Sequence, residues 1–436
     1  MTALVDTTGY RALFEEQAAR GPEKIVLLED LRRDAFSRFE ALGFPSTRME
    51  DWKYTSVSPI SKESFSLPEA RSGSEVPDAA LPLAGVTSTR LVFVDGVLDP
   101  GLSDPLGQDG VRLLDIASAL EAGLARYADF RSHAFVALNT ALFSGGAFLD
   151  VADGAHTARP IHVVHVASPA GRPTVVSPRT FVRVGRDASV ALIESYASRG
   201  GNVFTNAVTE IVCGENAVVD HCRLAIGNES TLHVATGQTW QAPASLFRST
   251  AVHLGGQLVR HESNVLLDGP GAETVLNGFY MTAGRDHVDN HTVIDHAAPH
   301  TRSRELYAGV LAGRSTAAFN GAIIVRPHAQ GTAAGQRNRN LLLSDEAIVH
   351  TKPELQIHAD DIKCTHGATI GQLDPDALFY LRTRGFDLGS ARRVLTEAFA
   401  ADVFGAIGIP QLEAALTREF RNRLSEAVGE KVHENV

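Results

Sequence analysis

Cys364 and His366 are the residues of this sequence best suited to metal chemistry. They follow an alternating apolar run at Leu355, Ile357 and Ala359, and this alternation predicts a β-strand. Residues i and i+2 of a strand point to the same face, so we expect the thiol and the imidazole side by side. Both groups bind soft or borderline metals. On spacing alone, the commoner arrangement is an ordinary buried cysteine beside a histidine, because two ligands do not complete a site.

A second concentration of candidate ligands is the histidine-rich run 286–300. Its β-branched residues favour an extended chain, in which His287 and His296 point to opposite faces. Histidines that are solvated or paired along neighbouring strands are therefore expected here more than a metal site. Cys213 and the pair His221-Cys222 form a further candidate group, but Cys213 occupies an apolar position that is typical of a core residue.

Several catalytic and nucleotide-binding motifs are absent from the sequence. It has no Gly-x4-Gly-Lys-Ser/Thr loop to hold nucleotide phosphates, so we expect no ATP hydrolysis by this chain itself. It also lacks a Gly-x-Ser-x-Gly nucleophile elbow and a Gly-x-Gly-x-x-Gly dinucleotide-binding turn. The adjacent carboxylates Asp360 and Asp361 would face opposite ways on a strand, which makes a poor acid–base pair. The residues alone therefore name no enzyme.

The composition is that of a globular chain with an ample core. Of 436 residues 44% are hydrophobic, and the formal net charge is −11 without a block dense in lysine and arginine, which argues against nucleic acid as a partner. Three cysteines are an odd and sparse count that fits a reducing compartment. No signal-peptide pattern and no window of membrane-spanning apolar length occurs, so a cytoplasmic location without membrane association is expected.

Helical patterns occupy the two ends of the chain. Apolar residues recur every three or four positions over 8–42, with a break at Gly21-Pro22 that predicts two helices. The same period returns after Asp374-Pro375-Asp376 and predicts three helices, the second beginning near Ser390 and the third at Pro410. We therefore divide the chain into an N-terminal helical region (1–60), a linker plus mixed α/β segment (61–146), a core (147–373) and a C-terminal helical domain (374–436).

Within 61–146, the stretch up to residue 90 is rich in serine, proline, glycine and glutamate and is expected to be a linker. A strand is predicted at Arg90–Gly96, and a helical stretch from Leu113 to about Phe143. Before the linker, the segment 48–55 places two aromatic residues among four charges. It is interpreted either as a docking segment or as a loop that Trp52 and Tyr54 pin to the core.

The core segment 147–373 contains a loose internal repeat. Residues 182–190 align with 211–219 at a constant offset, so that Gly185 matches Gly214. Weaker repeats follow near Gly269 and Gly313, each with an apolar strand, a tight turn, a small residue and a second apolar strand. Such units predict coils that stack their faces on one another. The predicted fold is a mainly β core with α ends, a right-handed parallel β-helix flanked by helical domains.

An ordered series of motifs covers most of the chain. The motifs are Glu50-Asp51-Trp52-Lys53-Tyr54-Thr55, Pro299-x3-Ser303, Phe319-x-Gly321, His328-Ala329-Gln330, Gln336-x-Asn338, Asp360-Asp361-x2-Cys364-x-His366-Gly367 and Phe379-Tyr380-Leu381. With this series the chain resembles the SufB/SufD family of iron–sulfur cluster assembly proteins of the SUF system. Gly367 after the histidine and the long helical N-terminus are similar to the SufD branch of that family.

The resemblance implies a β-helix core flanked by helical domains, the fold that the periodicity predicts independently. It also implies a non-catalytic subunit of the SufBCD scaffold complex that pairs with SufB as a heterodimer through the β-helix. Residues 374–430 would dock a SufC ATPase, which would supply the ATP hydrolysis. The exposed solenoid surface would also allow a homodimer when SufB is absent.

For the site, the resemblance implies that His366 contributes to a transient iron–sulfur cluster or iron shared with SufB, with Cys364 as a nearby thiol. These two are the candidate cofactor-binding and metal-ligating residues, and no catalytic residue is predicted. A reduced flavin on the complex is a further cofactor that the resemblance leaves open. Two other classes also stay open: an inert adaptor without metal contact, and a β-helix carbohydrate-active enzyme, which the missing export signal and acidic cluster disfavour.

Overall fold

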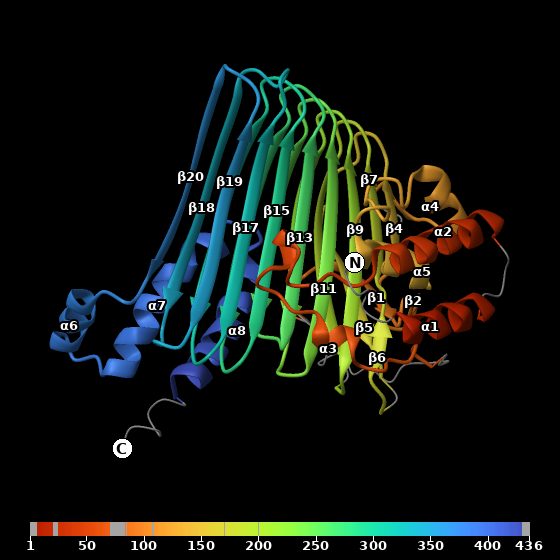
Figure 1. The fold of residues 1–436 in the computed structure, drawn as a ribbon. Coiled ribbons are helices and arrows are strands. Elements are labelled where there is room, and N and C mark those ends of the chain that lie inside the picture. The colour runs from red at the N-terminus through yellow and green to blue at the C-terminus, as the bar shows by residue number, and fades with distance from the viewer. Residues whose placement is uncertain are drawn as a thin grey trace.

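The computed structural model describes residues 7–20, 25–69, 83, 85–106, 109–169, 171–198 and 200–429. A parallel β-solenoid forms its core, with helices packed at both ends of the chain (Figure 1). From β7 onward successive strands alternate between two sheets, and each strand pairs in parallel with the strand two places further along the chain. The predicted parallel β-solenoid with helical ends is therefore confirmed.

The first sheet runs in the order β2, β1, β5, β8, β10, β12, β14, β16, β18, β20. Its strands are β1 (Thr89–Val94), β2 (Val97–Leu98), β5 (Ile161–Ala167), β8 (Ser189–Ser198), β10 (Val218–Ile226), β12 (Leu246–Leu254), β14 (Glu273–Thr282), β16 (Arg302–Leu311), β18 (Thr332–Leu342) and β20 (Ile362–Gly371). Strand β1 thus extends the solenoid into the segment that the sequence predicts as mixed α/β, because it pairs in parallel with β5.

The second sheet runs from β3 to β19. Its strands are β3 (Val111–Leu113), β4 (Gly146–Val151), β6 (Thr174–Val176), β7 (Arg179–Val184), β9 (Val203–Cys213), β11 (Thr231–Gln241), β13 (Leu258–Leu267), β15 (His287–His296), β17 (Thr316–Val325) and β19 (Ile348–Ile357). Strand β6 pairs with β9 beside β7, and β3 is antiparallel to β4. Apolar side chains from both sheets fill the interior between them.

The predicted repeat corresponds to neighbouring coils. Val182 pairs with Ile211 and Val184 with Cys213, which is the alignment that the sequence gives. Gly214 lies at the turn between β9 and β10, where an added Cβ would come within 2.8 Å of the Val184 carbonyl oxygen. A glycine is required there because one coil passes directly over the backbone of the preceding coil.

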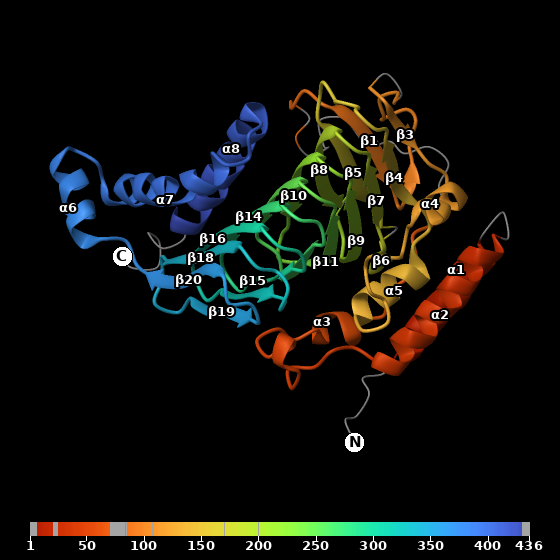
Figure 2. The same ribbon diagram turned by 90° about the horizontal axis from the view of Figure 1, so that it is seen from above.

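Helices cover the outer faces of the two sheets on opposite sides (Figure 2). On one side lie α1 (Thr8–Ala19), α2 (Val26–Leu42) and α5 (Ala134–Leu142), with α3 (Ser58–Ser61) and the short η1 (Glu50–Trp52) nearby. On the other side α7 (Leu388–Phe404) and α8 (Pro410–Gly429) pack on the first sheet, and α6 (Pro375–Thr383) projects from them. The two N-terminal and three C-terminal helices that the sequence predicts are confirmed.

The single helical stretch predicted from Leu113 to Phe143 is wrong. Leu113 ends β3, and α4 (Ile116–Ala122) stops at Gly123, whose φ of +119° favours glycine. The following loop is held by the buried carboxylate of Glu210, which accepts hydrogen bonds from the backbone of 125–128. Part of the predicted linker, 70–82 and 84, lies outside the described residues. No helix in the described ranges is long and apolar enough to cross a membrane.

Candidate functional site

Cys364 and His366 lie on the last strand of the first sheet. Both fall within β20, so they share one face, as the alternation predicts. This face looks into the solenoid, because Cys364 packs with the interior apolar cluster that contains Ile323 and Ala334. Burial raises the pKa of the half-buried Cys364 thiol, although a backbone hydrogen bond from Ala334 partly offsets it. His366 is exposed, because no further coil covers this end.

The end of the solenoid at β19 and β20 is open. These two strands are the terminal strands of their sheets among the described residues, so each has one edge without a neighbouring strand. Figure 1 shows both strands at the end of the solenoid farthest from α1 and α2. Ile348 on β19 and Ile370 on β20 are each 50% exposed. Open strand edges with exposed apolar residues can pair with strands of another chain.

Cys364 and His366 do not make up a metal site by themselves. In the part of the chain that the structure describes, no group of three or more His, Cys, Asp or Glu side chains could hold a metal ion. Cys364 and His366 can supply a thiolate and an imidazole, a donor set that suits iron or an iron–sulfur cluster. A site completed by a second chain would bind such a group reversibly.

The histidine-rich run does not form a metal site in the described structure. Asp289 and His291 lie on the outer face of β15, with 3.1 Å between the Asp289 Oδ1 and the His291 Nε2. His296 points inward, where its two ring nitrogens contact the hydroxyl groups of Thr301 and Ser303. These contacts are of the kind expected for histidines that are solvated or paired along neighbouring strands.

The second candidate group is part of the packing. Cys213 lies in the interior cluster, whereas Cys222 packs under the C-terminal helices, so the two sulfurs are on different faces. Burial raises the pKa of each of these thiols to about 12. His221 points inward and pairs with Glu194 at 2.9 Å. The interpretation of Cys213 as a core residue is confirmed.

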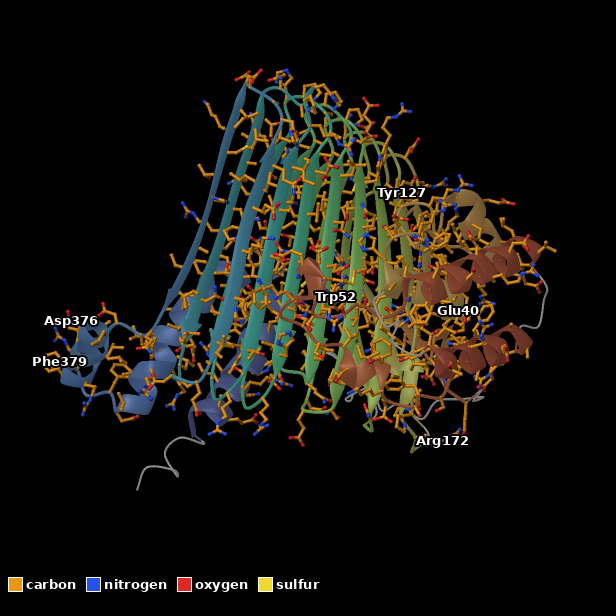
Figure 3. The ribbon with its side chains drawn as sticks, in the orientation of Figure 1. Glu40, Trp52, Tyr127, Arg172, Asp376 and Phe379 are labelled. Carbon is orange, nitrogen blue, oxygen red and sulfur yellow. The ribbon has the colours of Figure 1, made fainter. Side chains whose placement is uncertain are left out.

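The charged and aromatic segment 48–55 is pinned to the second sheet. Trp52 lies 3.7 Å below the guanidinium of Arg260, and Figure 3 shows it against the solenoid strands. Tyr54 stacks on His350 with 3.9 Å between the ring centres. The Thr55 hydroxyl donates to the Asp289 carboxylate at 2.5 Å. This structure supports the interpretation of the segment as a loop fixed to the core.

The C-terminal helices combine a packed layer with an exposed one. Phe404 and Phe420 contact Phe279 of β14 with ring centres 4.8 and 5.0 Å apart, which fixes α7 and α8 to the first sheet. Helix α6 has no buried residue, and Phe379 on it is 70% exposed (Figure 3). The further exposed apolar residues of this region are Tyr380, Phe386, Leu388 and Val394. We call this set the α6 patch.

Comparisons with known proteins agree with this architecture. The family described as the SufBD core domain of the SUF system for FeS cluster assembly matches residues 165–399, and the family of SufBD N-terminal regions matches 6–81. The chain belongs to the SufBD family. It is 32% identical to an iron–sulfur cluster assembly SufBD family protein of Synechocystis, over 93% of both chains.

Two further relatives extend the comparison. The chain is 30% identical to the iron–sulfur cluster assembly protein SufD of Escherichia coli, over 95% of this chain and 96% of that protein. It is also 30% identical to the chloroplastic protein ABCI7 of Arabidopsis thaliana, over 89% and 84% respectively. The family resemblance and the SufD likeness inferred from the motifs are therefore confirmed, and the chain is a SufD-like member of an iron–sulfur cluster assembly family.

Sequence reasoning singled out Gln336 only as part of a motif and did not consider Glu305. Both side chains point into the solenoid beneath the open end, where Gln336 donates to Glu305 at 2.6 Å. Gln336 and His366 are register partners on β18 and β20. The signal that could have found them is the repeat itself, because Glu305, Gln336 and His366 follow one another at about one coil length.

Proposed function

We propose that this chain is a SufD-like, non-catalytic subunit of a SufBCD scaffold on which nascent iron–sulfur clusters are assembled. The open end of the solenoid carries this proposal, because it combines two unpaired strand edges with a thiol and an imidazole that face the same way. The strand edges would bind SufB, and Cys364 and His366 would then meet ligands from SufB across the interface. Cluster and iron are the cargo of this site.

An incomplete site suits a scaffold better than a closed one. Four protein ligands around one metal give a stable structural site, whereas a site divided between two chains opens when the chains separate or shift. Burial raises the pKa of the Cys364 thiol, so in the isolated chain the thiol favours its protonated form. A cation or basic group brought by the partner would favour the thiolate, the form that binds metal.

The α6 patch supports the proposal of a second partner. Its exposed aromatic and aliphatic residues lie on α6, on the loop that follows it and on the first half of α7, and α6 projects from the layer packed on the solenoid (Figure 2). Exposed apolar patches of this kind mark protein interaction sites. We assign this patch to SufC, whose ATP hydrolysis would drive movement of the SufB–SufD interface.

Co-expression with the cognate SufB and SufC tests the partner assignment. We expect the chain to co-elute with both proteins in size-exclusion chromatography, and a chain lacking residues 374–436 to lose SufC while retaining SufB. If the full chain joins neither protein, the proposed function is wrong. If it joins both but supplies no metal ligand, the chain is the inert adaptor. The metal content of complexes with and without the candidate ligands decides between the scaffold subunit and the inert adaptor.

A further inference from the structure

A column of polar side chains lies inside the solenoid directly behind the open end. Glu305 of β16 and Gln336 of β18 are register partners, and both are nearly fully buried. Gln336 in turn pairs in register with His366 of β20. All three side chains point to the interior face of the first sheet, so they follow one another at the spacing of adjacent strands, about 4.8 Å.

The amide of Gln336 has a defined orientation. Its Nε2 donates to Glu305 Oε2 at 2.6 Å, so its Oε1 is directed away from that carboxylate. Gln336 is 1% exposed, and its Oε1 has no hydrogen-bond partner within the protein. A buried amide oxygen without a partner is uncommon and costs free energy, which favours a rotation of a neighbouring side chain that brings a donor to this oxygen.

The opposite wall of the solenoid is shaped to accept this side chain. Gly321 of β17 faces Gln336 across the interior, and an added Cβ on Gly321 would lie 2.2 Å from the Gln336 Nε2. A larger residue at 321 would therefore displace the amide from its bond with Glu305. Gly321 and Gln336 both occur in the motifs that the sequence analysis singled out, and their contact gives those motifs a shared physical role.

We infer that Gln336 is a positioning residue for His366: its Oε1 accepts a hydrogen bond from one ring N–H of His366, and Glu305 holds the amide in the orientation that makes this possible. The bond selects one tautomer and turns the other ring nitrogen, with its lone pair, toward the open end. Histidines that bind metals commonly donate their second ring N–H in this way. The inference deepens the proposed function, because it assigns a support to the imidazole of the shared site.

The test is the tautomer of His366 in the full chain, read from the ring nitrogen resonances after selective ¹⁵N-histidine labelling. The resonances of His366 are assigned by their loss in His366→Ala. At pH 8.5 we expect about a fivefold preference for one tautomer, the size that one net hydrogen bond gives. The preference should disappear in Gln336→Leu. The matched control is Asn338→Leu, which removes a buried amide from the same strand but pairs with Ala368 instead of His366.

A double variant keeps the test independent of folding defects. Glu305→Gln combined with Gln336→Glu exchanges the two groups between β16 and β18. The amide introduced at position 305 can then donate to the carboxylate introduced at position 336, and the second oxygen of that carboxylate can accept from His366. We expect this exchange to restore the single tautomer. Equal tautomer populations in the wild-type chain, or an unchanged preference in Gln336→Leu, would overturn the inference.

The same variants in the co-expressed complex separate this inference from the proposed function. Loss of a group that orients a metal-binding histidine commonly lowers metal affinity about 10- to 100-fold. We expect Gln336→Leu to lower the iron content of the complex and the exchanged pair to recover it. A fixed tautomer in a complex whose iron content does not depend on His366 would support the positioning role and refute the cluster role.

Discussion

Two glutamates inside the solenoid differ in their ionisation because their neighbours differ. Burial opposes ionisation of Glu194, but the Arg223 guanidinium at 3.2 Å and the His221 ring at 2.9 Å outweigh it and hold its pKa below the ordinary value. Glu305 is also buried, but the side chain that donates a hydrogen bond to it, Gln336, is neutral, and burial raises its pKa to about 7. The first glutamate is a structural ion, and the second is a group whose charge depends on pH.

Glu305→Gln should stabilise the protein in a pH-dependent way. The raised pKa in the folded chain means that the wild type binds this proton more tightly when folded, so its stability falls as pH rises from about 4.5 through about 7. The glutamine variant does not show this loss. The difference in free energy of unfolding between the variant and the wild type should therefore increase by on the order of 3 kcal/mol from pH 5 to pH 8, in favour of the variant. Urea unfolding at both pH values measures this. An equal difference at pH 5 and pH 8 would contradict the assignment.

Glu194→Gln should have the opposite effect at neutral pH. The variant leaves the buried Arg223 without its carboxylate, and breaking a buried pair in this way costs about 3–5 kcal/mol. Because the pKa of Glu194 is lowered on folding, this contribution is present above the ordinary pKa of glutamate and is lost in acid. Urea unfolding at pH 7 measures the loss. Asp220→Asn is the control, since its half-exposed pair with Arg248 should be worth at most about 1 kcal/mol.

At the scale of elements, the sequence predicts those features of helices and strands that depend on residues close together along the chain. Asp374 and Asp387 cap α6 and α7 through their own side chains, and both helices begin close to their predicted starts. Similarly, the repeat around Gly185 and Gly214 predicts the true register of two coils. Such features could be predicted because the interacting groups lie within a few residues or one repeat of each other.

Features that depend on distant contacts could not be predicted. The loop after Gly123 is held by Glu210, more than eighty residues away along the chain. For the segment 48–55, the sequence offered a pinned loop as one of two interpretations but could not choose it, because the contacts with Arg260 and His350 leave no local signal. Of the candidate site, the shared face of Cys364 and His366 was predictable from alternation. The column beneath them required the register of three coils.

The α6 patch gives a prediction for a whole element. Phe379→Asp places a charge on the most exposed aromatic residue of α6, so the co-expressed complex should lose SufC and keep SufB. Pull-down through a tag on this chain, followed by quantification of both partners, measures this. Val97→Asp changes another exposed apolar residue, on β2, and should retain both partners. Retention of SufC by Phe379→Asp would reject the patch as its docking surface.

At the scale of the whole molecule, the late end of the solenoid, at β19 and β20, is open. The N-terminal helices pack beside its early coils, whereas β19 and β20 expose their edges, so association should involve the late coils. We expect the isolated chain to form homodimers at high concentration through these edges.

Lysines at both Ile348 and Ile370 should block edge pairing and give a monomer that also fails to bind SufB. Sedimentation equilibrium of the isolated chain measures the first effect, and co-elution with SufB the second. Val26→Lys with Leu27→Lys is the matched pair on the exposed face of α2 and should leave both associations intact. A doubly substituted chain that still dimerises would place the interface elsewhere.

The most direct test of the central claim is the iron and acid-labile sulfide content of the complex with SufB and SufC, purified without oxygen. The comparison is between wild type, His366→Ala and His358→Ala, the last of which removes an exposed imidazole from the turn that joins β19 to β20. We predict that His366→Ala leaves the complex intact but strongly lowers both iron and sulfide, while His358→Ala retains them. An intact His366→Ala complex with normal iron and sulfide would contradict a shared cluster site and leave this chain as a structural adaptor.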